Sequence, residues 1–452
     1  MTIVVDLRAR AARLSALFSA MLLTVLAPAA PAADDILTVT ITRGVESALP
    51  VAVAPFGAPP DNAGARRIVE TLREVVAADL NGSGRVRVPP VSGYPQAPHD
   101  FVSVDFPAWQ SADVQSLVIG RVVPSSASAY SVEFRLVDVY GATQVLGYRV
   151  PTRPDASRRT AHQIADIVYE ALTGEPGVFA TRIAYVSVDR ARDGGRLYRL
   201  NVADSDGANP SALLTSREPV LSPAWSPDGR RIAYASLEGS RATLFLQDLR
   251  SGQRRAVSSG SGMHSAPAFS EDGQQIALTI SKDGNPDIYV HSLQTGRTRR
   301  LTTSPAIDTE PTFAPDGGTI AFTSDRGGSP QIYTVPSEGG RPERLTFDMG
   351  SYNARPRYAP DGRSLAVVTR GANAGFAIGL IDLERGLLTT LTGGGLDESP
   401  SFAPNGRLIM YSTRRGSGSE LAVVSVDGRV RQRLTLGASE VREPAWGPLP
   451  PR

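Results

Sequence analysis

A repeat of about 44 residues constrains the fold of this chain more than any other feature. After residue 220, a proline is followed two residues later by an aromatic residue six times, and the spacings between successive prolines are 44, 44, 45, 44 and 44. The pairs are Pro223 with Trp225, Pro267 with Phe269, Pro311 with Phe313, Pro356 with Tyr358, Pro400 with Phe402 and Pro444 with Trp446. Such a period indicates an array of one structural unit whose copies bury their apolar faces against one another.

Each repeat reads as a run of short strands. Asp-Gly or Asn-Gly follows five of the six aromatic residues, and these dipeptides favour tight hairpins because glycine accepts a positive φ. Apolar strands come next, at residues 232–236, 276–280, 320–324, 365–369 and 408–412, and stretches such as "DIYVHSL" and "RRLT" supply a third and a fourth strand. Four antiparallel strands in about 44 residues predict the blade of a β-propeller.

The two ends of the repeat region complement each other. Residues 181–187 read as a second strand without a first, and residues 442–448 supply a proline–aromatic strand with nothing after it. We therefore predict an all-β, six-bladed propeller over residues 176–452, closed by pairing of the C-terminal strand with the first blade. Closure leaves no exposed sheet edge, whereas a seventh blade or an open solenoid would leave strands unmatched.

The region before the repeats has a different pattern. Strands are predicted at residues 37–42, 51–55, 85–88, 114–123, 130–140 and 144–150, and helices at 63–80 and 156–173, where apolar residues mark one helical face. We expect residues 33–175 to form a small α/β domain with an extended N-terminal strand.

The first 32 residues predict a cleavable signal peptide. Three arginines, Arg8, Arg10 and Arg13, precede an apolar stretch at 14–26, and Ala30 and Ala32 provide a small-residue cleavage site. The apolar stretch is too short to span a membrane; the alternative is an N-terminal anchor. We expect an exported protein that is soluble once the signal peptide is removed.

Charge and cysteine content exclude several classes of function. The chain carries a net charge of +2, and residues 1–32, with three Arg and one Asp, account for all of it. A nucleic-acid binder would need a basic face, so neither nucleic acid nor direct membrane binding is predicted. Because cysteine is absent, disulfides, thiol catalysis and cysteine metal sites are absent as well.

The familiar motifs for catalysis and metal binding are absent from the sequence. The sequence has no G-x-S-x-G elbow, phosphate-binding loop or H-E-x-x-H pair. "DGNPD" at 283–287 begins like a calcium loop, but Ile288 and Gln294 stand where glycine and glutamate are required. The chain's histidines lack metal-ligand spacing: His99, His162, His264 and His291. We therefore predict no catalytic residue, metal or cofactor, and hairpin geometry accounts for turn residues such as Asp228.

The three residues before each repeat proline vary while the scaffold stays constant. If the proline–aromatic strand is innermost, these triplets surround one mouth of the central channel and form a mixed polar rim that suits a protein partner. The alternative is solvated loop tips without a ligand. The triplets are Val220-Leu221-Ser222, His264-Ser265-Ala266, Asp308-Thr309-Glu310, Asn353-Ala354-Arg355, Asp397-Glu398-Ser399 and Val441-Arg442-Glu443.

Several motifs, taken in order, resemble those of the TolB family, the propeller component of the Tol–Pal envelope system. The stretches that carry the resemblance are "EPGVFATRIAYVS", "SPAWSPDGRRIAYAS", "HSAPAFSEDG", "NPDIYV", "IDTEPTFAPDGGTIAFTSDRGGSPQIY", "LDESPSFAPNG" and "EPAWGP". The resemblance covers nearly the whole chain after the signal peptide. The sequence departs from the family pattern at "SYNARPRYAPDG", where Arg355 and Arg357 add positive charge. The resemblance therefore does not assign the partner contacts around that blade.

The resemblance implies a periplasmic adaptor without enzymatic activity. Members of the family bind the peptidoglycan-associated lipoprotein Pal at the propeller mouth, and colicin translocation segments can occupy the same mouth. By motif position, His264, Thr309 and Glu310 match the family's Pal-contact surface, with Ala266 and Pro267 beside the histidine. Together with the rim argument, the candidate Pal-binding residues are Leu221, Ser222, His264, Ala266, Pro267, Thr309, Glu310, Asn353, Arg355, Asp397, Glu398, Arg442 and Glu443.

The family also implies a second partner, the inner-membrane protein TolA, bound through the N-terminal segment. Leu37, Val39 and Ile41 alternate with threonines, which predicts a strand that can add to a partner's sheet or pack onto its own domain. The resemblance further implies that Pal binding tucks this segment away, which requires Pal to favour one state of the segment. The candidate TolA-binding residues are Asp34, Asp35, Ile36, Leu37, Thr38, Val39, Thr40 and Ile41.

We expect the protein to be a monomer, and two other classes of function remain as alternatives. One is a glycan- or small-ligand-binding propeller, which would need an aromatic stacking platform, although the triplets contain no aromatic residue and Tyr352 lies just outside them. The other is a peptidase-type propeller enzyme or a lyase, which lacks support from any nucleophile or metal motif.

Overall fold

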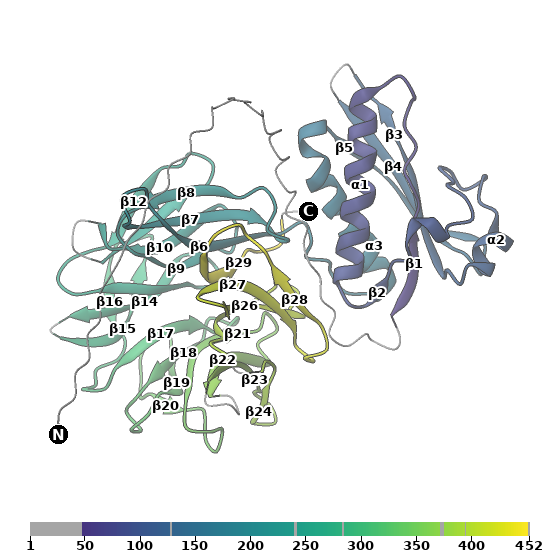
Figure 1. The fold of residues 1–452 in the computed structure, drawn as a ribbon. Coiled ribbons are helices and arrows are strands. Elements are labelled where there is room, and N and C mark those ends of the chain that lie inside the picture. The colour runs from purple at the N-terminus through teal and green to yellow at the C-terminus, as the bar shows by residue number, and fades with distance from the viewer. Residues whose placement is uncertain are drawn as a thin grey trace, which may run out of the picture. The chain divides into compact units, whose positions relative to one another are not determined.

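A computed structural model describes residues 48–126, 129–238, 242–282, 284–370, 375–393 and 395–450. The first part of the described chain is an α/β domain (Figure 1). Its elements are β1 (Leu49–Val53), α1 (Ala63–Gly82), β2 (Val86–Arg87), α2 (Phe106–Ser111), β3 (Ser116–Pro124), β4 (Tyr130–Asp138), β5 (Thr143–Thr152) and α3 (Ser157–Thr173), with short 3-10 turns at Val91–Gly93 and Pro154–Ala156.

The five strands of this domain form one mixed sheet in the order β2-β1-β3-β4-β5. The strand β1 is parallel to both of its neighbours, and β3, β4 and β5 are antiparallel. Helices α1 and α3 lie side by side on one face, where Leu72 and Ile164 are fully buried. The segment around α2 covers part of the other face with the buried Trp109. This packing follows the helical apolar periodicity, which buries one stripe of each helix.

The sequence predicted both long helices and the strands of this domain to within a few residues. It did not predict α2, which is too short to show a helical period, although Asp105 accepts a hydrogen bond from Ala108 N at 3.2 Å as its N-cap. The predicted strand at 37–42 and the signal peptide lie outside the described residues.

The rest of the described chain is made mainly of strands and the turns between them. They are β6 (Arg182–Arg190), β7 (Arg196–Asp204), β8 (Ser211–Ser216), β9 (Val220–Trp225), β10 (Arg231–Ser236), β11 (Thr243–Asp248), β12 (Arg254–Ser258), β13 (His264–Phe269), β14 (Gln275–Lys282), β15 (Asn285–Ser292), β16 (Thr298–Arg300), β17 (Asp308–Phe313), β18 (Thr319–Ser324), β19 (Gln331–Pro336), β20 (Glu343–Arg344), β21 (Asn353–Tyr358), β22 (Ser364–Arg370), β23 (Phe376–Asp382), β24 (Leu387–Thr390), β25 (Glu398–Phe402), β26 (Leu408–Arg415), β27 (Gly418–Ser425), β28 (Arg431–Leu434) and β29 (Glu440–Trp446).

These strands form the sheets of a propeller-type fold (Figure 1). Four sheets contain four antiparallel strands each: β9 to β12, β13 to β16, β17 to β20 and β21 to β24. The last strand, β29, pairs antiparallel with β6, so that Val441 lies opposite Ser187 and Trp446 opposite Ile183. The end of the chain therefore completes a sheet that the start of the repeat region began.

The proline–aromatic strands lie next to one another. Strand β9 contacts β13, and the contacts continue through β17, β21 and β25 to β29, which contacts β9 in turn. The predicted hairpin turns are confirmed: Gly229, Gly273, Gly317, Gly362 and Gly406 all have positive φ. The residue before each of these glycines accepts the N–H two residues ahead, as Asp228 does from Arg230 at 3.0 Å. These aspartates and the asparagine therefore hold turns.

The α/β domain and the propeller sheets belong to one compact unit. Polar contacts connect them around the linking segment. Glu175 forms an ion pair with Arg407 at 2.7 Å, Asn405 Nδ2 donates to Pro176 O at 3.0 Å, and Ser205 Oγ donates to Phe179 O at 2.7 Å.

Candidate functional site

The first residue of each variable triplet is buried. His264 Nδ1 lies 2.7 Å from Ser258 Oγ, Asn353 Nδ2 donates to Gln331 Oε1 at 3.0 Å, and Asp397 Oδ1 accepts from Thr413 Oγ1 at 2.6 Å. Burial lowers the pKa of His264, so this imidazole is neutral at pH 7. The predicted residues His264, Asn353 and Asp397 are thus buried, and their hydrogen bonds hold the inner strands in place. The full set is Val220, His264, Asp308, Asn353, Asp397 and Val441.

The third residue of each triplet has a left-handed backbone. All six φ values lie between +49° and +58°, although none of these residues is a glycine and each precedes a buried proline. The strand register slips at the same place in every inner strand, which marks a β-bulge. Bulges re-aim side chains, and here they do so six times at equivalent positions. These residues are Ser222, Ala266, Glu310, Arg355, Ser399 and Glu443.

Neighbouring sheets are joined by hydrogen bonds to these bulged residues. The backbone N–H of Ser222 donates to the Glu443 carboxylate, and that of Glu310 donates to Thr279 Oγ1 at 3.2 Å. The N–H of Arg355 donates to Glu310 Oε2 at 3.1 Å, and its guanidinium donates to Ser399 Oγ. Because a buried N–H that leaves the ladder needs another acceptor, these bonds fix the bulges and connect one inner strand to the next.

Strand β21 adds positive charge to the set of bulged residues. Arg355 Nε forms an ion pair with Glu310 Oε1 at 2.7 Å, and Thr323 Oγ1 donates to Glu310 Oε2 at 3.0 Å. Burial opposes the charge of Arg355, but Glu310, Glu443 and Glu398 outweigh it and raise its pKa. Burial lowers the pKa of Arg357, although Glu310 and Glu443 favour its charged form. Both arginines therefore lie close enough to Glu310 and Glu443 to interact with their charges.

Large apolar residues precede four of the six triplets, a feature that was not predicted from the sequence. Met263, Ile307 and Leu396 each stand directly before a triplet and are 49%, 49% and 43% exposed. Tyr352 occupies the equivalent position and packs against Phe376, with ring centroids 5.0 Å apart. Exposed apolar side chains beside polar ones are typical of protein-docking surfaces. The signal was available, since three of these four positions hold large aliphatic residues at the same point of the repeat.

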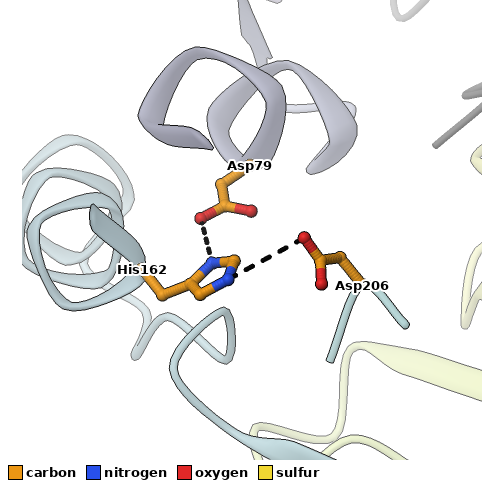
Figure 2. Close-up of side chains that lie close together, drawn as sticks. All are labelled: Asp79, His162 and Asp206. Carbon is orange, nitrogen blue, oxygen red and sulfur yellow. Dashed lines mark hydrogen bonds and ion pairs between the residues drawn. The ribbon is translucent and has the colours of Figure 1, made fainter. Parts of the chain in front are cut away.

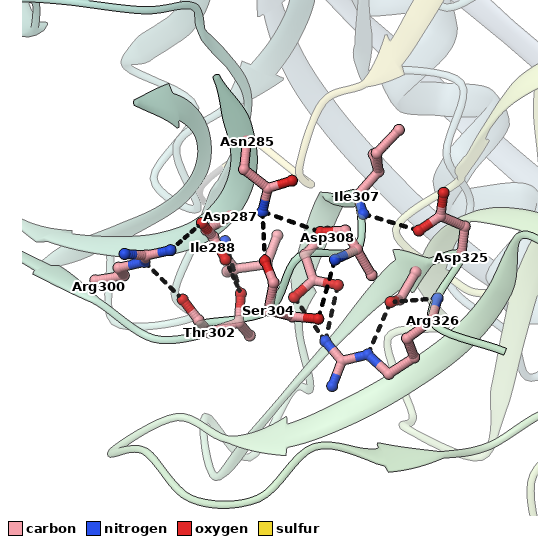
Figure 3. Close-up of polar contacts among 12 residues, drawn as sticks. Asn285, Asp287, Ile288, Arg300, Thr302, Ser304, Ile307, Asp308, Asp325 and Arg326 are labelled. Carbon is pink, nitrogen blue, oxygen red and sulfur yellow. Dashed lines mark hydrogen bonds and ion pairs between the residues drawn. The ribbon is translucent and has the colours of Figure 1, made fainter. Parts of the chain in front are cut away.

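One ion pair and one backbone hydrogen bond hold the segment that contains Ile307 in place (Figure 3). Arg326 donates two hydrogen bonds to the fully buried Asp308, at 2.8 and 2.6 Å. The N–H of Ile307 donates to Asp325 Oδ1 at 2.8 Å. These bonds fix the backbone that presents Ile307, Thr309 and Glu310.

The calcium-like stretch has a structural role. Asp287 is buried in β15 and pairs with Arg300, and Asn285 Nδ2 donates to the carbonyls of Ser304 and Ala306 at 2.5 and 3.1 Å (Figure 3). The side chains of Asp287 and Asn285 therefore already have protein partners.

Within the described residues, one group of three side chains offers ligand atoms of the kind that metals bind. Asp79, His162 and Asp206 place one such atom each within 4.8 Å of the others (Figure 2). His162 Nδ1 already lies 2.7 Å from Asp79, and Asp206 contacts Arg158. The arrangement is that of an imidazole between two carboxylates. The sequence could not show it, because helix packing brings Asp79 and His162 together.

The candidate TolA-binding residues, Asp34 to Ile41, lie outside the described residues. A search of the helices that the structure describes finds none with the length and apolarity to cross a bilayer.

Known proteins resemble this chain over nearly its whole length, and the matches agree on one family. The model of the TolB amino-terminal domain matches residues 37–145, and that of the TolB beta propeller domain matches residues 169–450. The Tol-Pal system protein TolB of Nitrosococcus oceani is 55% identical over 422 residues, which cover 92% of this chain and 95% of the relative. That of Thioalkalivibrio sulfidiphilus is 53% identical over 418 residues, with 92% and 95% covered.

A solved structure is similar as well. The crystal structure of TolB from Acinetobacter baumannii superimposes with a TM-score of 0.82 at 39% sequence identity, and the match covers 92% of this chain and all of that one.

Proposed function

This chain belongs to the TolB family of the Tol–Pal system, and from that premise we propose that it is a periplasmic adaptor without enzymatic activity. It binds the lipoprotein Pal at the propeller mouth and TolA through residues 34–41. By linking the two partners it supports outer-membrane integrity and envelope constriction during division. Colicin translocation segments compete with Pal for the same mouth. The domain organisation that goes with this function is a signal peptide at 1–32, an α/β domain at 33–175 and the propeller at 176–452.

The proposed propeller has six blades and is closed. Each four-stranded sheet is one blade, β25 to β28 form another, and β29 completes a blade with β6, β7 and β8. The antiparallel pairing of β29 with β6 and the cyclic contacts among the six inner strands support this arrangement. In a closed ring all six bulged residues face the same end of the central channel.

The observation that carries the proposal is the layered chemistry of this end. Exposed apolar side chains precede three of the six bulged residues, which are polar except for Ala266, and buried partners hold these segments in place. Arg355 already neutralises part of the charge of Glu310. A partner therefore meets a preorganised surface, and preorganisation lowers the entropic cost of binding. The deeper residues His264, Asn353 and Asp397 contribute by holding that surface.

The apolar layer provides the sharper test with Pal. We expect Met263→Ala combined with Ile307→Ala to weaken Pal binding, measured by calorimetry, by about tenfold or more, since buried anchors dominate interface energies. The matched control is Phe347→Ala, an exposed aromatic residue outside the triplet segments. Equal affinities of the double variant and the control would exclude the mouth as the Pal site.

The charged layer is tested separately with the same assay. Glu310→Ala removes the carboxylate that orients Arg355, and His264→Ala removes the buried support at the start of β13. Together they should abolish most Pal binding, whereas Glu338→Ala, an exposed glutamate in the turn after β19, should not change it. Unchanged binding of the double variant would contradict the assignment of these residues.

The TolA arm of the proposal has its own experiment. Deletion of residues 34–41 should abolish capture of TolA and leave Pal affinity intact. Retained TolA binding would place that site elsewhere in the chain.

A further inference from the structure

A buried histidine lies where the α/β domain meets the first propeller sheet. His162 on α3 is 1% exposed, and its Nδ1 lies 2.7 Å from Asp79 Oδ2 on α1. Its other nitrogen, Nε2, points toward Asp206 Oδ2 in the turn between β7 and β8, 3.8 Å away (Figure 2). Nε2 has no hydrogen-bond partner. The imidazole thus spans two carboxylates that belong to different domains.

Other charges around this histidine support the same junction. Arg158, one turn earlier on α3, contacts Asp206 and lies 3.8 Å from Asp204. Asp206 Oδ1 also accepts the N–H of Ala208 at 3.0 Å, which holds the turn in shape. One turn later on the same face of α3, Asp166 accepts the N–H groups of Phe179 and Ala180 at 2.7 and 3.0 Å. The β7–β8 turn therefore places the Asp206 carboxylate next to α3.

We propose that protonated His162 latches α1 and α3 to the turn between β7 and β8, and that loss of its proton loosens this latch as pH rises. In the charged form the imidazolium attracts Asp79 and Asp206 together. In the neutral form only the hydrogen bond to Asp79 remains, because an uncharged Nε2 at 3.8 Å gains nothing from Asp206. The Arg158 contact persists in both forms, so the latch loosens without full separation.

The direction of the effect follows from the neighbours of His162. Burial alone favours the neutral imidazole, but Asp79 and Asp206 outweigh burial and Arg158, so the pKa of His162 is raised. Burial likewise raises the pKa of Asp79, and His162 opposes this rise. A raised histidine pKa contributes stability below its ordinary value of about 6.5, and this stability is lost as pH rises through the raised value.

Asp166 acts on the same helix with the same sign but in a lower pH range. Burial raises its pKa to about 7 despite its two backbone hydrogen bonds, so its ionisation costs stability as pH rises toward that value. Ser205 in the β7–β8 turn bonds to Phe179, so this effect can reach the turn. The His162→Gln variant separates the two groups, because it keeps Asp166 and removes only the histidine.

The first experiment is a nuclear magnetic resonance titration of the histidine rings. The chain has four histidines, so His162→Gln identifies the His162 signal by its disappearance. We expect wild-type His162 to titrate above about pH 6.5 and Asp206→Asn to lower that midpoint by about half a unit or more. The side-chain amide oxygen of the Asp206→Asn variant can still accept the Ala208 N–H, so the turn should survive.

The matched control is Asp193→Asn. Asp193 lies in the turn between β6 and β7 of the same sheet, accepts a backbone N–H at 3.1 Å and pairs with Arg217. It has the same local role as Asp206 without a histidine. Its replacement should leave the His162 midpoint unchanged. An identical midpoint in wild type and Asp206→Asn, or an equal shift in both variants, would overturn the latch.

The second experiment measures amide hydrogen exchange in the β7–β8 turn at about pH 6 and pH 9, corrected for intrinsic exchange rates. The wild-type turn should exchange about three- to tenfold faster at the higher pH, and His162→Gln should lose most of this dependence and keep only the part that Asp166 contributes. A pH-independent turn in the wild type, or an unchanged dependence in His162→Gln, would contradict the proposal.

Discussion

The residue before each repeat proline has a backbone conformation that costs free energy. A left-handed φ costs an ordinary L-residue about 1–2 kcal/mol, and a following proline restricts the backbone further. Ser222 and Ala266 show that side-chain chemistry does not require this conformation, because neither is the asparagine or glycine that tolerates it best. The surrounding hydrogen bonds and the buried prolines impose it, which is typical of positions where a fold directs side chains toward a partner.

Substitutions at Ser222 test this strain directly. Ser222→Val should lower the free energy of unfolding by about 1–2 kcal/mol more than Ser265→Val, because a β-branched residue tolerates positive φ poorly. Ser265 stands in the second triplet position of β13 and has no positive φ. Ser222→Gly should be close to neutral, since relieved strain offsets the added entropy of the unfolded chain. Urea unfolding provides the measurement, and equal losses in both valine variants would show that no strain is stored there.

The candidate residues were predictable from the sequence in their position along the chain but not in their orientation. The repeat period places all six triplets at equivalent points. Simple strand alternation would have exposed every second residue, and the bulge breaks that alternation between Thr309 and Thr312 and at each equivalent site. Burial of His264 and Asn353 therefore followed only from the structure. The ion pair of Glu310 with Arg355 joins residues 45 positions apart, which no local pattern shows.

At the scale of elements, helix α1 depends on one residue at its start. Asn62 Oδ1 accepts the N–H of Ala65 at 2.9 Å and the hydroxyl of Tyr130 on β4 at 3.0 Å. The same side chain thus caps the helix and ties it to the sheet. The start of this helix was predictable at Ala63, because asparagine is a preferred N-cap. The bond to Tyr130 was not, since it depends on how the helix packs against β4.

Replacing the cap should destabilise the α/β domain. We expect Asn62→Ala to lower its free energy of unfolding by about 1–2 kcal/mol, because an N–H of the first turn loses its acceptor. Asn62→Ser restores a capping oxygen and should recover most of this loss, while Tyr130→Phe isolates the second bond. Chemical denaturation of the full chain, followed by exchange protection of α1, measures all three. If serine and alanine behave alike, the cap contributes no measurable stability.

At the scale of the whole molecule, the two ends of the repeat region depend on each other. Val441 and Ala445 of β29 are buried against the sheet that contains β6, and Trp446 Nε1 donates to Thr181 Oγ1 at 2.8 Å. The sequence predicted this pairing because each end lacked what the other supplied. It could not predict the junction with the α/β domain, where His162 meets Asp206, because those contacts depend on the packing of surfaces that have no repeat.

Removal of residues 440–452 tests how far the fold depends on this pairing. Without β29, strand β6 keeps β7 but loses its other antiparallel neighbour and presents an unpaired edge, which favours association between chains. The truncated chain should therefore unfold in urea with a lower midpoint and a broader, less cooperative transition, and it should form larger species on gel filtration. Trp446→Phe keeps the strand and removes one hydrogen bond, so it should cost only about 1 kcal/mol with cooperativity intact. A truncated chain that stays monomeric and unfolds as the full chain does would show that the remaining sheets are stable without the terminal strand.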